Sequence, residues 1–150
     1  MASVKRKVRH NIIPKSSFEL RIPYLNSGTL NVAKKNKLFH NNKIEVRKSS
    51  LQGYGVFAKE DIKNGEMLEE CHYITVEEDD EVDRYLFNWP RSGDCEKYVI
   101  PLGFGSMYNA ATPAGKKNTD WETDLEDNIM VFHTVKDVKK DTELLMNYNY

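Results

Sequence analysis

Short runs of alternating apolar and polar residues predict strands over most of the chain from residue 44 onward. Residues 44–47 alternate with a period of two, residues 56–58 form an apolar run after a Gly-Tyr-Gly turn, and residues 128–134 alternate again. A period of two places successive side chains on opposite faces of a strand. We therefore expect a domain in which strands dominate.

Turn signals and short apolar runs predict the remaining elements. Residues 63–66 read as a turn, and residues 67–76 follow as a strand, while residues 143–146 form the last strand. Residues 83–89 are expected to form a short helix that Pro90 ends. Few, short helices beside many strands favour a β-rich α+β fold over an alternating βαβ enzyme.

Charge is distributed unevenly along the chain. Residues 1–48 hold 12 basic and two acidic residues, a net charge of +10, whereas the rest holds 10 basic and 21 acidic residues, a net charge of −11. Residues 31–42 are polar and rich in Asn and Lys. We therefore expect a basic leader over 1–42, partly ordered or disordered, and one domain over 43–150. Such a leader can attract nucleic acid or fold back onto an acidic body.

The composition limits where in the cell the protein is expected to be and which metal sites it is expected to form. The 150 residues contain no apolar run near the roughly 18 residues that a membrane helix needs, and residues 1–10 are not followed by the apolar stretch expected of a secretory signal. Two cysteines, Cys71 and Cys95, and four histidines show no zinc-ligand spacing. We expect a soluble intracellular protein, cytoplasmic or nuclear, with free thiols, no structural metal and no membrane contact.

Three separated motifs carry the chemistry. They are Ser-Ser-Leu-Gln-Gly-Tyr-Gly-Val-Phe-Ala at 49–58, Leu-Gly-Phe-Gly-Ser-Met-Tyr-Asn at 102–109, and the C-terminal Glu-Leu-Leu-Met-Asn-Tyr-Asn-Tyr at 143–150. In this order and with these gaps they resemble SET-domain protein lysine methyltransferases, most closely the short single-domain members of viruses and bacteria. The resemblance covers residues 44–148.

The resemblance implies both a fold and an activity. The expected fold is the SET fold, with small curved β-sheets, few short helices and a C-terminal segment threaded in a pseudoknot. The implied activity is S-adenosylmethionine-dependent N-methylation of protein lysines. Since only two residues follow Tyr148, the chain resembles the type without a zinc-binding post-SET segment.

Five residues are predicted by this resemblance to hold the cofactor. The backbone of Gly53, Tyr54 and Gly55 would contact the methionine portion, because glycine allows a ligand to approach the main chain closely. The Asn109 side chain has the donors and the acceptor needed to hold the cofactor amino group. The backbone of Ala110 would contact the adenine.

Three tyrosines are predicted to act at the methyl-transfer site. By the resemblance, Tyr148 occupies the position of the family's catalytic tyrosine, whose hydroxyl lies near the methyl group and the incoming amine. Tyr85 matches a tyrosine of the substrate channel, and Tyr108 is expected to line the same channel. The chain departs from the family at Ala110, where the family has His, and at the following Pro-Ala-Gly of residues 113–115.

The departure at Ala110 leaves two alternatives open. One is a SET-fold module that binds or regulates with weak or no catalysis, and the other is a nucleic-acid-associated protein that acts through its basic N-terminal residues 1–48.

The acidic stretch 77–83 suggests a basic protein substrate, such as a histone tail or a ribosomal protein, with an exposed lysine. Residues 18–30 are apolar enough for an interface, so a homodimer is expected. Trp89 and Trp121 are interpreted as packing residues and His133 as a hydrogen-bonded structural histidine.

Overall fold

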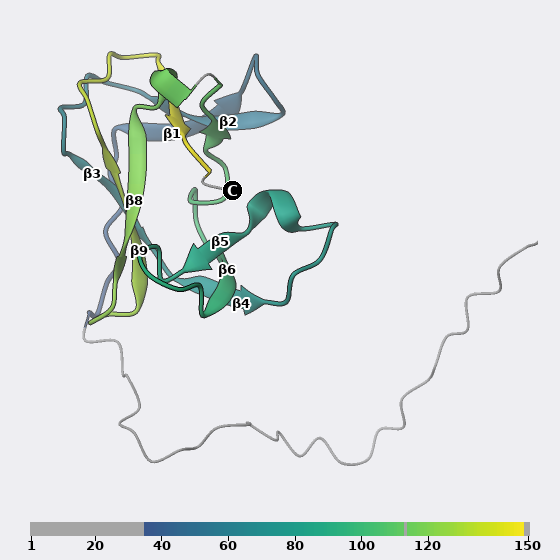
Figure 1. Cartoon of the computed structure of the whole chain (residues 1–150). Coiled ribbons are helices and arrows are strands. Elements are labelled where there is room, and N and C mark those ends of the chain that lie inside the picture. Colours follow the sequence, from purple (N-terminus) through teal and green to yellow (C-terminus); the bar gives the residue numbers. More distant parts are fainter. Residues whose placement is uncertain (1–34, 113, 149–150) are drawn as a thin grey trace, which may run out of the picture. The chain divides into compact units, whose positions relative to one another are not determined.

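The structure is a computed structural model that describes residues 35–112 and 114–148. Ten strands and two short 3-10 helices, at Asp83–Tyr85 and Ala114–Lys116, make up the secondary structure of these residues. The strands form one four-stranded and two three-stranded sheets. Strands β8 and β9 run along one side of the domain, with β1 and β2 near one end and β4, β5 and β6 near the other (Figure 1).

The four-stranded sheet has the order β1-β2-β10-β7. Its strands are β1 (Ile44–Lys48), β2 (Tyr54–Ala58), β10 (Glu143–Met146) and β7 (Asn109–Ala110). Strand β10 is antiparallel to β2 and parallel to β7. The C-terminal strand thus lies between two segments that are far apart in sequence.

Hydrogen bonds wrap residues 109–118 around β10. The Asn118 amide donates to the Glu143 carbonyl at 2.8 Å and accepts from the Leu145 N–H at 2.7 Å. The Ala111 N–H donates to the Met146 carbonyl at 2.7 Å. These contacts on both sides of β10 produce the threaded C-terminal segment.

The other two sheets separate a region predicted as one strand. Strands β3 (Met67–Cys71), β9 (Ile129–Thr134) and β8 (Thr119–Asp124) form an antiparallel sheet, and β4 (Tyr73–Val76), β6 (Lys97–Pro101) and β5 (Phe87–Trp89) form another. The predicted strand 67–76 is therefore divided at His72, because its two halves pair with β9 and β6.

The predicted helix over 83–89 is also wrong beyond its first turn. A 3-10 helix spans Asp83–Tyr85, and β5 follows from Phe87 to Trp89. Phe87 and Trp89 are buried on one face of β5, with Asn88 exposed between them. Cross-strand pairing with β6 overrides the local helical signal.

The core lies where the sheets meet. Leu68, Phe132, Leu144 and Met146 are fully buried, and Phe132 contacts Phe87 edge-on. Trp89 and Trp121 are buried as well, which confirms their interpretation as packing residues. The interpretation of His133 is wrong in one respect, because its Nδ1 is buried without a hydrogen-bond partner among the described residues.

Residues N-terminal to the expected domain boundary contact β3. His40 pairs with Glu69 as an isolated bridge, and the Asn41 N–H donates to the Leu68 carbonyl at 2.8 Å. The boundary at residue 42 itself stays a prediction, and residues 1–34 of the expected leader lie outside the described residues. No helix in the described part of the chain is long and apolar enough to cross a membrane.

Candidate functional site

The turn between β1 and β2 brings the backbone close to two polar side chains. Gly53 has a φ of +50°, a conformation that L side chains rarely adopt, and its carbonyl accepts the Ser49 N–H at 2.9 Å. A Cβ on Gly55 would lie 2.1 Å from Glu143 Oε1 and 2.8 Å from Asn109 Nδ2. Glycine at position 55 therefore permits a close approach of three chain segments.

Asn109 joins these segments through its amide nitrogen. This nitrogen lies 2.7 Å from Glu143 Oε1 and 3.2 Å from the carbonyl oxygens of Gln52 and Tyr54. The Ser49 hydroxyl donates to Glu143 Oε2 at 2.9 Å and fixes the carboxylate from the other side. Asn109 is thus held in one orientation at the rim of the turn.

The roles of Ser49 and Glu143 went unrecognised in the sequence. Both residues lie inside the motifs, but their side chains meet across 94 positions of the chain. A single serine and a single glutamate at that separation produce no recognisable spacing. Only the pairing of β10 with β2 brings them together.

A cavity of about 690 Å³ opens over this turn. Its lining contains seven of the eight predicted site residues and some neighbours: Gln52, Gly53, Tyr54, Arg84, Tyr85, Ser106, Met107, Tyr108, Asn109, Ala110 and Tyr148. The eighth, Gly55, is buried beside Asn109 and Glu143. The volume lies within the usual range for pockets that hold small molecules.

Tyr148 lines this cavity and a second, smaller one of about 250 Å³. Its hydroxyl donates to the Tyr108 carbonyl at 2.5 Å, and its ring lies 5.3 Å from that of Phe87. The phenol therefore forms part of the wall between two cavities. This arrangement suits a reaction in which two ligands meet from opposite sides.

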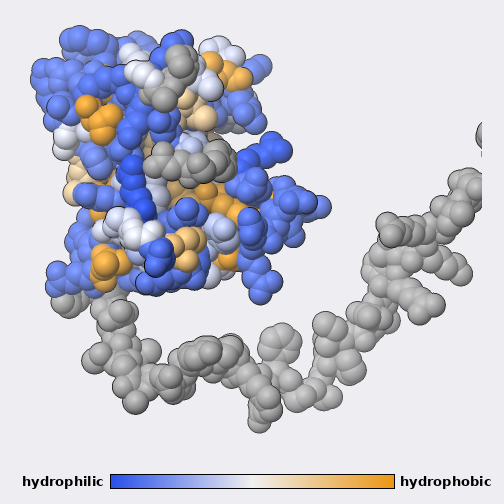
Figure 2. Space-filling view, in the orientation of Figure 1, coloured by the Kyte–Doolittle hydropathy of each residue, from blue (hydrophilic) through white to orange (hydrophobic). Residues whose placement is uncertain are grey.

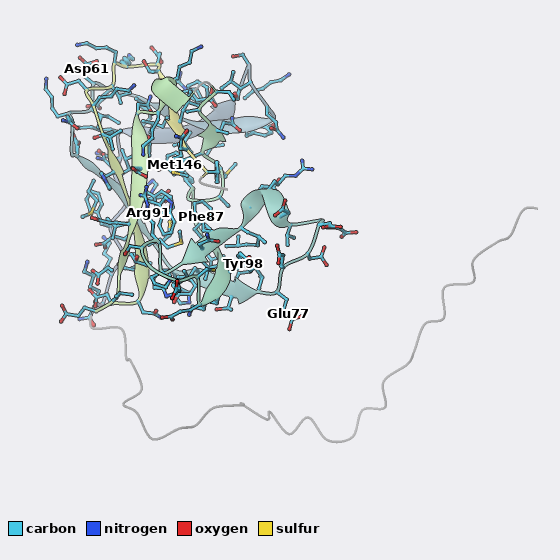
Figure 3. All side chains as sticks on the ribbon, in the orientation of Figure 1. Asp61, Glu77, Phe87, Arg91, Tyr98 and Met146 are labelled. Carbon is cyan, nitrogen blue, oxygen red and sulfur yellow. The ribbon has the colours of Figure 1, made fainter. Side chains whose placement is uncertain are left out.

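The smaller cavity combines aromatic walls with charged groups. It is lined by Glu78, Asp83, Leu86, Phe87, Asn88, Arg91, Tyr98, Trp121 and Tyr148. Figure 3 labels Phe87, Arg91 and Tyr98 of this cavity, and Glu77 lies farther out on the loop between β4 and β5. An aromatic cavity with carboxylates in its lining can accept a long aliphatic side chain that carries a positive charge.

Arg91 is held by its own ion pair. Its Nη1 lies 2.5 Å from Asp120 Oδ1, and its guanidinium lies 5.3 Å from the centre of the Trp121 ring. Burial alone would raise the pKa of Asp120, but hydrogen bonds from Arg91 and Lys117 outweigh it and lower that pKa. Asp120 is therefore a carboxylate that fixes one wall of the smaller cavity.

Tyr85 and Tyr108 lie against the larger cavity and not the smaller one. Tyr85 is exposed at the end of the 3-10 helix, whereas Tyr108 is buried and its ring stacks on Phe132 at 5.3 Å. Their assignment to the substrate channel stays a prediction. Ala110 exposes its side chain and pairs through its backbone with Met146 of β10.

Surface hydropathy, the two cysteine thiols and the arrangement of potential metal ligands add little to the description of this site. The face shown in Figure 2 is mainly hydrophilic, with smaller hydrophobic areas. Cys71 is buried and Cys95 exposed, and both thiols are free. Among the described residues, no group of three or more His, Cys, Asp or Glu side chains is arranged to hold a metal ion.

The SET domain profile matches residues 53–149. A histone-lysine N-methyltransferase of Schizosaccharomyces pombe, specific for lysine 37 of histone H3, is 25% identical over 113 residues, which cover 70% of this chain and 72% of that protein. The profile match over residues 53–149 includes the turn, the glycine-rich segment and the C-terminal strand.

Solved structures agree in fold. A Plasmodium falciparum protein described as a histone methyltransferase superposes with a TM-score of 0.59 at 28% identity, over 73% of this chain and 96% of that chain. A Chaetomium thermophilum Polycomb repressive complex 2, bound to S-adenosylmethionine, gives a TM-score of 0.55 at 26% identity, over 71% of this chain and 15% of that chain. From the extent of the profile match, the chain belongs to the SET domain family.

Proposed function

We propose that this protein is an S-adenosylmethionine-dependent protein lysine N-methyltransferase in which Tyr148 acts at the reacting groups. The observation that carries the proposal is that Tyr148 lines both cavities, with its hydroxyl held by the Tyr108 carbonyl. The family and its histone-methylating relatives support the same reaction.

The larger cavity fits the cofactor. Backbone carbonyls at Gln52 and Tyr54 lie beside the Asn109 amide, and position 55 has no space for a Cβ. In the proposed assignment, Gly53–Gly55 and Ala110 contact the cofactor through their backbones, and Asn109 holds its amino group. When bound, S-adenosylmethionine supplies a sulfonium methyl group, which passes to a neutral amine while the electrons of the broken C–S bond stay on sulfur.

The smaller cavity fits a lysine side chain. Glu78 and Asp83 can attract the charged ammonium, and the rings of Phe87, Trp121 and Tyr148 can pack along its methylene groups. An apolar wall favours the neutral amine, because desolvation lowers the pKa of an ammonium group. The Tyr148 hydroxyl can then orient the nitrogen lone pair after its proton has left to water.

The proposed substrate is a basic protein segment such as a histone tail. The relative from Schizosaccharomyces pombe acts on lysine 37 of histone H3, so H3 peptides around that lysine are the first to test. A nuclear or cytoplasmic location would suit such a substrate. The homodimer and nucleic-acid binding through residues 1–48 stay predictions.

One observation favours the alternative of a binding module without turnover. Ala110 lines the larger cavity with a methyl group, where the family pattern has an imidazole. Its backbone pairing with Met146 is nevertheless intact. Cofactor binding without methyl transfer would identify this alternative.

Two measurements test the proposal. Calorimetric titration with S-adenosylmethionine should give a dissociation constant in the micromolar range, which corresponds to a binding free energy of about −7 to −8 kcal/mol. Mass spectrometry of histone H3 peptides incubated with protein and cofactor should then show added methyl groups on lysine. A titration that shows no heat of binding up to millimolar S-adenosylmethionine would contradict cofactor binding. Cofactor binding without a methylated product on any histone or ribosomal protein would contradict the activity.

A further inference from the structure

The carboxyl group of Glu69 is buried behind the proposed active site. Glu69 is 2% exposed in β3, and its backbone lies opposite Phe132 of β9. Its Oε2 accepts the Phe104 N–H at 3.1 Å, whereas Oε1 is buried without a hydrogen-bond partner among the described residues. Burying a carboxyl group in this way costs stability, so its presence calls for an explanation.

The glycine-rich loop 102–107 rests directly on Glu69 and its neighbours. Gly103 has a φ of +93°, and a Cβ there would lie 3.1 Å from Glu69 Oε2 and 3.4 Å from Cys71 Sγ. A Cβ on Gly105 would lie 2.9 Å from Phe132 Cζ. The loop is therefore in close contact with β3 and β9, and the Phe104–Glu69 hydrogen bond is a polar anchor beneath it.

The loop leads directly into the residue that holds Tyr148. Tyr108 is 2% exposed, stacks on Phe132 with an interplanar angle of 12°, and accepts the Tyr148 hydroxyl through its carbonyl at 2.5 Å. Glu69 is thus connected to Tyr148 by the Phe104 hydrogen bond, the main chain from residue 104 to residue 108, and the hydrogen bond of the Tyr148 hydroxyl to the Tyr108 carbonyl. Movement of the loop would shift the carbonyl and the phenol together.

The surroundings of Glu69 contain several titratable groups. Burial raises the pKa of Glu69, although the hydrogen bond from the Phe104 N–H and the nearby Cys71 thiol and Tyr108 hydroxyl oppose this increase. The Tyr108 hydroxyl and Glu69 influence each other's pKa, yet the hydroxyl makes no hydrogen bond of normal geometry with any described residue. His40 Nδ1 lies 3.9 Å from Glu69 Oε2 on the outer side.

We propose that Glu69 is a positioning residue for Tyr148. By accepting the Phe104 N–H it anchors the loop 102–107, and the loop fixes the Tyr108 carbonyl that orients the Tyr148 hydroxyl. The consequence for turnover rests on the proposed methyltransferase function. The positioning itself concerns only the geometry of this chain.

Three variants separate positioning from general stability. Glu69→Met keeps the length of the side chain but removes the acceptor, Glu69→Gln keeps a carbonyl acceptor for Phe104, and Glu70→Met is the matched control. Glu70 is the adjacent buried carboxyl; it accepts the Phe39 N–H at 2.9 Å and pairs with Lys35, so its own partners lie outside the loop 102–107. We expect Glu69→Met to lower kcat roughly ten- to a hundredfold, because small misplacements of catalytic groups have effects of that order.

The other two variants should retain turnover. Glu69→Gln should keep kcat within about threefold of the parent, and so should Glu70→Met even if it melts at a lower temperature. An equal loss of kcat in Glu69→Met and Glu70→Met would overturn the proposal, because both effects would then reflect general destabilisation. A Glu69→Gln variant as slow as Glu69→Met would also overturn it.

A double-mutant cycle tests whether Glu69 acts through the phenol. In a Tyr148→Phe background, where the oriented hydroxyl is absent, Glu69→Met should lower kcat by no more than about twofold. A loss as large as in the parent background would show that Glu69 acts independently of Tyr148 and would overturn the proposal.

A spectroscopic readout makes the test independent of activity. The ring-carbon NMR signal of isotope-labelled Tyr148, assigned by its loss in Tyr148→Phe, reports the hydrogen bond of the hydroxyl. It should move in Glu69→Met and remain in place in Glu69→Gln and Glu70→Met. An unchanged signal in folded Glu69→Met would overturn the positioning role. Absence of turnover in the parent would instead contradict the proposed function and leave this readout valid.

Discussion

At the scale of single residues, Gly55 and Gly53 are glycines for different reasons. Gly55 lacks space for a Cβ beside Glu143 and Asn109, whereas Gly53 has open space but a φ of +50°. We expect Gly55→Ala to displace the Glu143 carboxylate from Asn109 and weaken S-adenosylmethionine binding by about tenfold, or about 1.4 kcal/mol.

Gly53→Ala serves as the matched comparison in the same turn. Its left-handed backbone should cost about 1 kcal/mol of folding free energy, with a smaller effect on cofactor affinity. Calorimetry and thermal melting measure the two effects separately. Equal cofactor affinities of Gly55→Ala and the parent would show that the close approach of Gly55 to Asn109 and Glu143 is not needed for cofactor binding.

The Tyr148 hydroxyl is the second feature at this scale. Tyr148→Phe keeps the ring contact with Phe87 but removes the oxygen that the Tyr108 carbonyl holds. An interaction made in the transition state affects kcat more than ground-state binding. We therefore expect a large loss of kcat with cofactor affinity within a few-fold of the parent.

Steady-state kinetics and calorimetry on the same preparation check this expectation. The control is Tyr73→Phe, which removes a buried hydroxyl bonded to Asn128 at 2.5 Å, outside both cavities. It should lower the melting temperature without lowering kcat. Unchanged turnover in Tyr148→Phe would remove the hydroxyl from the mechanism.

At the scale of secondary-structure elements, Asn118 holds the threaded strand in place. Its side chain satisfies one acceptor and one donor of the β10 backbone, and Asn118 is 5% exposed. Asn118→Ala leaves both backbone groups without their partner. Each unsatisfied buried group costs about 1–3 kcal/mol, so for the two groups we expect a loss of roughly 2–6 kcal/mol in the free energy of unfolding.

Chemical denaturation of Asn118→Ala and of Asn88→Ala measures this effect. Asn88 is exposed on β5, so its replacement should change the free energy of unfolding by no more than about 0.5 kcal/mol. Similar values for the two variants would show that β10 is held by strand pairing alone. Glu143 begins this strand and Tyr148 follows it, so loosening the strand would also displace Glu143 from Asn109 and Tyr148 from both cavities.

At the scale of the whole molecule, four carboxylates among the described residues stabilise the fold in their charged form. Hydrogen bonds lower the pKa of Asp61 through Lys139, of Glu66 through Lys43, and of Asp137 through the Asn64 N–H. The pKa of Asp120 is also lowered, despite its burial, by Arg91 and Lys117. Except for the pair of Lys117 with Asp120, these contacts connect segments that are distant in sequence.

The direction of these pKa shifts determines the response to acid. A carboxylate whose folded-state pKa lies below its unfolded value stabilises the fold above the unfolded pKa of about 4, and this contribution is lost as the pH falls through the folded pKa. The free energy of unfolding should therefore decrease below about pH 4. Asp120→Asn should lower stability at neutral pH and flatten this decrease, whereas a parallel pH profile would contradict the role of Asp120.

Much of the strand content could be predicted from local patterns. Period-two alternation predicted β1 and β9, whereas β2 begins at Tyr54, inside the turn predicted over residues 53–55. Strands β6, β7 and β8 were not predicted, because their sequences show no clean alternation and they are specified by their partners. The division at His72 escaped prediction for the same reason: a continuous apolar pattern does not reveal which sheet each half joins.

The sequence by itself determined which residues are chemically able to act. Its motifs placed Gly53–Gly55, Asn109 and Tyr148 in a family pattern, and the alternation of apolar and polar residues predicted a β-rich domain. Tertiary structure alone decided how those residues meet. The threaded strand β10 brings Glu143 to Asn109, and Tyr148 to the wall between two cavities. The buried position of Glu69 beneath the glycine-rich loop is likewise a product of sheet pairing, because burial and long-range contacts depend on the whole folded chain and not on local sequence.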